Sequence, residues 1–283
     1  IKGSSTRQIF FTDCQVPVEN LLSERGNGFK IAVNILNLGR VKLAGAALGG
    51  AKRTSTLSLQ YANERQQFGR PIAKYGAIRH KLAEQAIRIY ACESATYRCS
   101  QNIEDAINTL KESGMDESKA KLKGVEQFAV EAAILKVYGS EVLDFVVDEG
   151  VQIYGGMGYS ADAPMERAYR DSRINRIFEG TNEINRLLIP GMLMKKALKG
   201  ELPLLAAAKA LQDEIMSPSM PVTGTSDEVL GDQARAVAAF KKVVLLVSQP
   251  SSVNVSVVTL LIRKARRFRR PHPEVIITKS PLL

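Results

Sequence analysis

The sequence predicts an all-α protein, an antiparallel helical bundle that follows a short stretch of strand and loop. From Gly28 onward, long segments rich in Ala, Leu and Ile alternate with short polar or glycine- and proline-containing connections. In one of these segments the apolar residues recur at alternating spacings of three and four, which is the period of a helix in a bundle. Sequence typical of strands is confined to the first 25 residues.

The N-terminal segment, residues 1–25, is expected to be strand and loop. A short run of β-prone residues covers 8–12, and Pro17 ends it at an edge or a turn. The chain opens Ile-Lys-Gly, with neither an initiator Met nor a signal-peptide pattern, so we expect further sequence upstream.

Three long helices are predicted next. The first runs from Phe29 to about Arg65 and is broken by the Gly-Arg-Pro sequence at 69–71. The second begins near Tyr75 and continues beyond Ile103, and a polar connection covers 108–118. The third carries the clearest period, at Val125, Phe128, Ala132, Leu135, Gly139, Val142 and Val146.

The bundle is expected to close with a glycine-rich loop, a short segment and a last helix. The loop covers 154–159, the segment covers 165–176, and the last helix runs from about Thr181 to Lys199. Lysines in its final turn, then Gly200 and Pro203, are the usual signals of a helix end. We assign 26–200 to the helical bundle.

Two regions follow the bundle. Residues 201–247 are predicted to hold two further helices, at 206–216 and 233–247, joined by a linker at 217–226. Residues 248–283 form an irregular basic tail with no period that would pack on the bundle. The tail is either an arm that binds an acidic partner or an out-of-frame or unrelated appendage, and its composition favours the second.

Composition narrows the classes of function. The formal net charge is +10, but the tail holds seven basic residues and one acidic residue, so the remaining chain is only mildly basic and a nucleic-acid binder is disfavoured. No apolar run approaches the roughly 20 residues that cross a bilayer, so no integral membrane segment is expected. Two histidines without ligand spacing and three cysteines without a CxxC pair predict no metal site and reduced thiols, with Cys92 and Cys99 as packing residues.

The most informative stretch runs from 170 to 184 and contains Phe-Glu-Gly-Thr-Asn-Glu-Ile. Glu179 lies just before the last helix, and Gly180 allows a ligand or backbone to approach closely. Thr181 is a good N-cap and Glu183 sits favourably in the first turn. A carboxylate held at such a junction is a candidate general base, although an exposed glutamate near a helix start has the same sequence features.

Four blocks in this order resemble the acyl-CoA dehydrogenase family over roughly residues 1–215. They are the end of the β-domain with the first bundle helix (1–49), the Arg-x-x-Phe-Gly motif (65–69), the Gln-x-x-Gly-Gly-x-Gly loop (152–158) and the glutamate motif (178–184). The resemblance implies that 1–25 is a β-domain remnant and that 26–200 is the C-terminal bundle. It also likens 201–247 to the start of the extension of very-long-chain members.

The resemblance implies a role for each matching residue. Glu179 would remove the α-proton of an acyl-CoA while FAD takes the β-hydrogen as hydride. Arg40 and Gly180 would lie at the substrate; the alternative for Arg40 is a surface helix residue. In some members the base stands immediately before that arginine, where this chain has Gly39. The residues implied to bind FAD are Arg65, Gln67, Phe68, Gln152, Gly155, Gly156, Thr181 and Glu183.

The expected function is therefore the α,β-dehydrogenation of a long-chain acyl-CoA to trans-2-enoyl-CoA in fatty acid β-oxidation. The chain would be a fragment of that enzyme, inactive alone, in the bacterial cytoplasm or the mitochondrial matrix. The family further implies a homo-oligomer, dimer or tetramer, and an electron-transferring flavoprotein as acceptor. The alternatives are an assembly or scaffold relative and an acyl-CoA oxidase.

Overall fold

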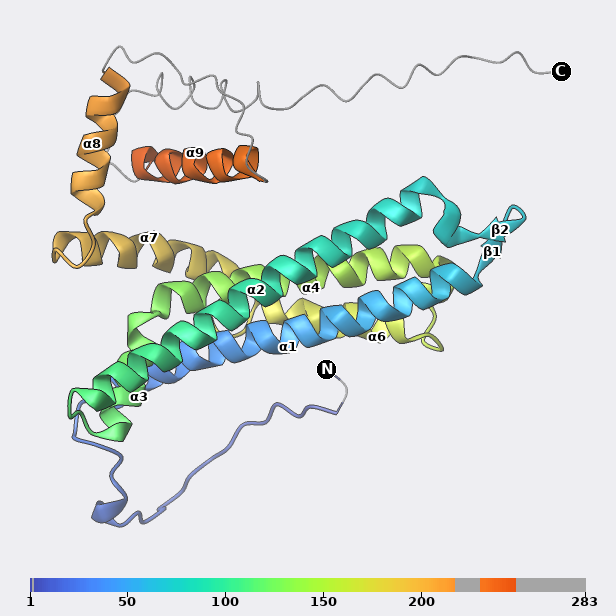
Figure 1. Ribbon diagram of the computed structural model, residues 1–283. Coiled ribbons are helices and arrows are strands. Elements are labelled where there is room, and N and C mark those ends of the chain that lie inside the picture. The colour runs from blue at the N-terminus through green and yellow to red at the C-terminus, as the bar shows by residue number, and fades with distance from the viewer. Residues whose placement is uncertain (2, 217–229, 248–283) are drawn as a thin grey trace. The chain divides into compact units, whose positions relative to one another are not determined.

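The computed structural model describes residues 1, 3–216 and 230–247 and divides the chain into two compact units, 1–192 and 193–283. The predicted linker at 217–226 and the basic tail lie outside the described residues. The first unit holds the bundle, and Figure 1 shows its long helices α1 (Gly28–Glu64), α2 (Gly76–Glu112) and α4 (Ala129–Tyr154) side by side. The all-α prediction is confirmed.

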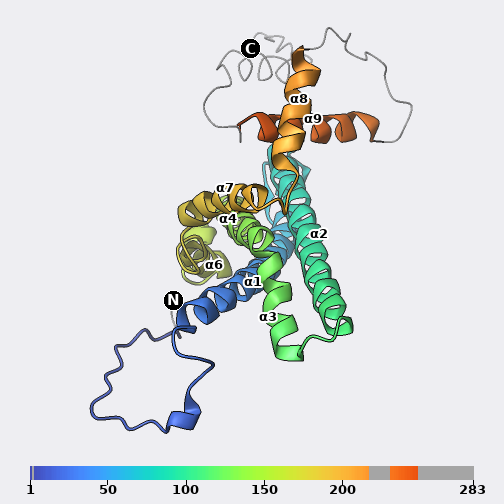
Figure 2. The same cartoon turned by 90° about the vertical axis from the view of Figure 1, so that its left-hand side faces the viewer.

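Contacts between helices show which of them run parallel and which run antiparallel. The Cα of Gly139 faces Ala44 and that of Gly150 faces Thr54, so α1 and α4 are parallel. Lys81 pairs with Glu149, and the Gln85 side chain donates to the Val146 carbonyl, so α2 runs against α4. Helix α6 (Pro164–Ser172), η3 (Arg173–Arg176) and the start of α7 (Asn182–Leu198) return along α4 as a fourth, broken helix. The order is therefore up-down-up-down. Figure 2 views the bundle from the left-hand side of Figure 1.

The core lies where α4 is covered by α1 and α2. The predicted seam is buried at Ala132, Leu135, Val142 and Val146, with exposed fractions of 3% or less. A Cβ on Gly139 would lie 3.1 Å from the Ala44 Cα, so this glycine permits the close approach of α1 and α4. Cys92 and Cys99 are both buried, as predicted, each in a different hydrophobic cluster of the bundle.

One predicted helix is two helices in the structure. Helix α3 (Glu117–Gln127) ends before Phe128, whose φ of −103° and ψ of 25° leave the helical region, and α4 starts at the next residue. The Phe128 N–H bonds to the Val125 carbonyl, so the last turn tightens before the chain restarts as a helix. The predicted connection at 108–118 is shorter than expected, because α2 continues to Glu112.

The strand predicted at 8–12 is not formed. Residues 3–17 have no helix or strand, and 18–20 form a single 3₁₀ turn, η1 (Val18–Asn20). Phe10 and Phe11 are about 80% exposed, so this segment has neither strand partners nor a core to cover. Its assignment as a β-domain remnant stays a prediction.

The two strands among the described residues form one short hairpin instead. Strand β1 (Gln66–Gln67) pairs antiparallel with β2 (Arg70–Pro71), and the short helix η2 (Ile72–Lys74) leads into α2. Both turn residues have positive φ, 51° at Phe68 and 81° at Gly69, as two-residue hairpins of type I′ require.

The second unit contains α8 (Leu204–Met216) and α9 (Gly231–Val247), which contact each other. Their bounds agree with the two helices predicted after residue 200. The buried apolar residues among the described part of this unit are Ala197, Ala208, Leu211 and Leu246, each about 5% exposed.

Helix α1 is, within the described part of the chain, the one helix long and apolar enough to cross a membrane by length and composition. In its most apolar window 39% of the residues are buried. The same length and composition occur in core helices, and α1 packs on both α2 and α4. The absence of a membrane segment therefore stays a prediction.

Candidate active site

The glutamate motif forms a turn between η3 and α7. Glu179 and Gly180 have φ of 59° and 80°, so two successive residues occupy the left-handed region. Glycine adopts it freely, whereas a glutamate there is uncommon and costs on the order of 1 kcal/mol or more. The Thr181 hydroxyl accepts from the Ile184 N–H at 3.3 Å, which confirms Thr181 as the cap of α7.

The Glu179 carboxylate lies against the backbone of α1 at Gly39. A Cβ placed on Gly39 would be 2.9 Å from Oε2 and 3.1 Å from Oε1, so only glycine leaves room for this rotamer. The Oε2 atom is buried and has no hydrogen-bond partner among the described residues. An unsatisfied buried carboxylate oxygen is rare in a protein and is typical of a site that receives a ligand.

Arg40 is the cation nearest this turn in α1, and it is 5% exposed. Its Nε donates to the Glu179 carbonyl at 3.3 Å and one terminal nitrogen donates to Asn37 Oδ1 at 3.0 Å. The alternative that Arg40 is a surface residue is therefore wrong. Burial lowers the pKa of Arg40, and the negative charge of Glu179 opposes this shift. Neither Arg40 nor any other described cation forms an ion pair with the Glu179 carboxylate.

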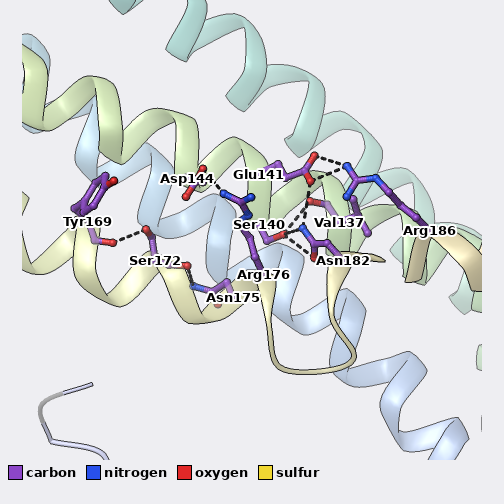
Figure 3. A network of polar contacts seen from close by, with 10 residues as sticks. All are labelled: Val137, Ser140, Glu141, Asp144, Tyr169, Ser172, Asn175, Arg176, Asn182 and Arg186. Carbon is purple, nitrogen blue, oxygen red and sulfur yellow. Dashed lines mark hydrogen bonds and ion pairs between the residues drawn. The ribbon is translucent and has the colours of Figure 1, made fainter. Parts of the chain in front are cut away.

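A buried polar network on α4 supports the other side of the turn. The Lys136 ammonium, with a fully buried side chain, donates to the Gly180 carbonyl and to Asn182 Oδ1, both at 2.7 Å. Figure 3 shows Asn182 pointing from α7 to Ser140 and Glu141 of α4, to which it donates at 3.0 and 3.3 Å. These residues hold the first turn of α7 against α4.

Asn185 completes the support from within α7. Its Nδ2 lies 3.4, 2.8 and 3.0 Å from the carbonyl oxygens of Glu179, Gly180 and Thr181, and its side chain is fully buried. Arg186 then pairs with Glu141 at 2.7 Å (Figure 3). The strained turn is thus held from α1, α4 and α7 at once.

Sequence reasoning missed Lys136, Asn182 and Asn185. A signal for Lys136 was present, because it lies four residues after Ala132 and three before Gly139, on the buried side of its helix. The two asparagines carried no such signal, since polar residues in a first helical turn are ordinary.

The remaining predicted cofactor residues form a second group at the end of the bundle where α1 and α4 both finish (Figure 1). Tyr61 and Tyr154 stack there, with ring centroids 4.0 Å apart, and bring the hairpin beside the glycine-rich loop. The predicted residues Arg65, Gln67, Phe68, Gln152, Gly155 and Gly156 are all exposed. Part of that loop is helical, α5 (Gly156–Tyr159).

The turn that contains Glu179 and this second group of residues are far apart within one chain. Ser140, which bonds Asn182, lies fourteen residues before Tyr154 on the same helix, and at 1.5 Å per residue this is about 20 Å. Of the residues implied to bind FAD, Thr181 and Glu183 lie at the same turn as Glu179. The others lie in the hairpin and the glycine-rich loop, at the distant end of the bundle. The pKa of the exposed Glu183 is lowered by its own backbone N–H and by the Thr181 hydroxyl, as suits a first-turn carboxylate.

Arginines recur every third residue at 167, 170, 173 and 176, a pattern that predicts structural ion pairs such as Arg170 with Glu166. Within the described residues Arg170 forms no ion pair with Glu166, and Arg176 instead pairs with Asp144 of α4 at 2.8 Å (Figure 3). An exposed pair within one helix is worth a few tenths of a kcal/mol, too little to fix its geometry. Within the same residues no three His, Cys, Asp or Glu side chains are grouped to hold a metal.

Comparisons with known proteins agree with this geometry. The family described as "Acyl-CoA dehydrogenase, C-terminal domain" matches residues 26–193. A probable acyl-CoA dehydrogenase of Bacillus subtilis is 48% identical over 85% of this chain and 41% of its own length. The very-long-chain specific acyl-CoA dehydrogenase of rat mitochondria is 42% identical over 67% of this chain and 26% of its own length.

Among solved structures, an acyl-CoA dehydrogenase of Bacillus anthracis complexed with FAD has a TM-score of 0.77 and 51% identity. It covers 82% of this chain, and 39% of the B. anthracis chain is covered in return. The present chain thus spans less than half the length of these relatives. The matched residues, the bundle and the glutamate turn together show that the chain belongs to the acyl-CoA dehydrogenase family.

Proposed function

We propose that this chain is the C-terminal part of an FAD-dependent acyl-CoA dehydrogenase, in which Glu179 removes the α-proton of the substrate. The reaction would convert a long-chain acyl-CoA to trans-2-enoyl-CoA in fatty acid β-oxidation. Because the chain spans less than half of its relatives, the proposal concerns the whole protein. The observation that carries it is the half-buried Glu179 carboxylate with one oxygen left unpaired.

A base needs a free lone pair beside the proton that it removes. Glu179 has one, because no described cation pairs with its carboxylate and no donor reaches Oε2. Its backbone N–H also makes no hydrogen bond to a described residue, so it is available to polarise a thioester carbonyl. The proton would pass from the α-carbon to the carboxylate, and the two electrons of the β-C–H bond would leave with that hydrogen.

The exposed residues of the second group fit the cofactor. The Arg65 side chain has no partner among the described residues, so its guanidinium is free to bind two phosphate oxygens. A Cβ on Gly155 or Gly156 would meet nothing within 4 Å, so the backbone of this loop is open to a ligand. When bound, FAD supplies the acceptor for the β-hydrogen as hydride.

The separation of the two groups supports an oligomer. Residues about 20 Å apart in one chain are implied to bind the same kind of cofactor. Two copies of the chain can form one such site if each contributes residues from a different end of its bundle. We therefore propose a homo-oligomer, dimer or tetramer. We further propose an electron-transferring flavoprotein as the acceptor and, from the B. subtilis relative, the bacterial cytoplasm as the compartment. The mitochondrial matrix is the alternative.

The visible spectrum of the flavin tests the proposal in the full-length protein. Addition of a long-chain acyl-CoA without oxygen should bleach the bound FAD, and medium- and short-chain substrates should bleach it more slowly. Bound flavin that no acyl-CoA bleaches would contradict dehydrogenation and favour an assembly role. Steady peroxide production in air would indicate an oxidase.

A further inference from the structure

We infer that Lys136 is a positioning residue for Glu179. Together with Arg40, Lys136 holds the backbone carbonyl groups of Glu179 and Gly180. This inference rests on the proposed function. The two cations approach the turn from different helices, Arg40 from α1 and Lys136 from α4. The Arg40 Nε lies 3.3 Å from the Glu179 carbonyl, and the Lys136 Nζ lies 2.7 Å from the Gly180 carbonyl.

These hydrogen bonds act on the soft torsions of the turn. The Glu179 carbonyl belongs to the peptide plane between the two residues whose φ angles are 59° and 80°, and the Gly180 carbonyl belongs to the next plane along the chain. A glutamate leaves the left-handed region readily unless its surroundings hold it there, because that conformation is intrinsically unfavourable. Fixing both planes therefore fixes the direction in which the Glu179 side chain leaves the backbone, toward Gly39.

The chemistry of Lys136 argues against a purely structural role. Its side chain is fully buried, yet its described hydrogen-bond partners are a carbonyl and the Asn182 amide rather than a carboxylate. A buried ammonium without a direct counter-ion costs several kcal/mol, and an apolar side chain of the same size would pack there at less cost. Such a group is retained where its hydrogen bonds or its charge serve a site.

The charges around Lys136 come from every neighbouring element. Burial, with the positive charge of Arg40, lowers the pKa of Lys136 to about 8, and the negative charges of Glu183, Glu179 and Glu141 oppose this shift. Arg40 lies on α1, Glu141 on α4, Glu179 in the turn and Glu183 on α7. Protonated lysine has three donors and neutral lysine has two, so the two observed bonds are possible in either form.

The test is Lys136→Met in the full-length protein with its FAD, which keeps the volume of the side chain and removes its donors. The measurement is the rate of anaerobic flavin reduction by acyl-CoA per bound flavin, so that lost flavin or unfolded protein does not count. We expect a fall of about 100-fold, the effect of misplacing a reacting group by about 1 Å. Binding of a non-reducible acyl-CoA analogue, followed by the flavin spectrum, should change by less than about threefold because no reacting atom is removed.

Lys81→Met is the matched control, because Lys81 is a half-buried lysine that also bonds to α4 but pairs with Glu149, about 20 Å from Lys136 along that helix. It should lower stability and leave the reduction rate per flavin unchanged. If Lys136→Met does not fold, Lys136→Gln keeps a donor nitrogen and should reduce the rate by about tenfold. A wild-type rate in the folded Met or Gln variant would overturn the inference and leave the proposed function intact. A wild-type protein that is not reduced would overturn both.

Discussion

Gly39 provides a sharp test of the site, because the three atoms nearest to a methyl group added there all belong to the base. The Cβ of Gly39→Ala would lie 2.9 Å from Glu179 Oε2 and 3.1 Å from its Cδ, whereas ordinary van der Waals contact begins near 3.4 Å. The carboxylate must therefore move by at least half an ångström. It is the free end of a flexible side chain, so the movement costs little stability but displaces the reacting oxygen.

The expected result is a separation of rate from stability. Alanine within a helix is more favourable than glycine by about 1 kcal/mol, which offsets the contact, so the unfolding free energy should stay within about 1 kcal/mol of the wild type. The rate of anaerobic flavin reduction should fall by about tenfold to 100-fold, because an error of 1 Å can cost about 100-fold.

Gly45→Ala is the matched control on the same helix. A Cβ at Gly45 meets nothing within 4 Å, so this variant should be stabilised by about 0.5–1 kcal/mol with an unchanged rate. Reduction of Gly39→Ala at the rate of Gly45→Ala would refute the contact between α1 and the base. A loss of rate in both variants would show that a methyl group added to α1 slows the reaction whether or not it contacts the base.

Three further predictions follow from burial and charge. Burial raises the pKa of Cys92, and that of Cys99 to about 11, so a thiol reagent at pH 8 should label the exposed Cys14 before either; equal labelling of all three, counted by mass spectrometry, would contradict the burial. The pKa of Lys136, lowered to about 8, means that the folded state binds fewer protons than the unfolded state from there to about pH 10. The unfolding free energy of the wild type, less that of the Lys136→Met variant, should therefore rise by about 2 kcal/mol between about pH 7.5 and 9.5 in denaturant titrations. A difference that stays flat or falls with pH would contradict the lowered pKa. Arg65→Ala should weaken FAD binding about tenfold to 100-fold in fluorescence titrations with no loss of stability, because the exposed guanidinium has no partner among the described residues; unchanged affinity would remove Arg65 from that site.

The bundle was predictable from the sequence because local signals and packing agree there. The three-four seam from Ala132 to Val146 gave the buried face of α4, and Gly200 with the preceding lysines placed the end of α7 within two residues. The break at Phe128 was not predictable, since both α3 and α4 carry the same period through it. The strand at 8–12 failed because β-propensity needs a neighbouring strand, which the described residues do not provide.

The site was predictable only in part. The roles of Glu179 and Arg40 came from the family resemblance, and the structure adds that the Arg40 side chain donates to the Glu179 carbonyl. The room at Gly39 could not be read from the sequence, because it depends on the approach of two segments 140 residues apart. The burial of Lys136 could have been read from its place on the buried side of α4, but its role could not, because its partner, the Gly180 carbonyl, is distant in sequence.

The most direct test of the account is the reduction of bound FAD in the Glu179→Gln variant of the full-length protein. Glutamine keeps the shape of the side chain but accepts no proton, so the variant should bind FAD and acyl-CoA normally and show no bleaching when substrate is added without oxygen. Bleaching at the wild-type rate would remove Glu179 from the mechanism and contradict the central claim.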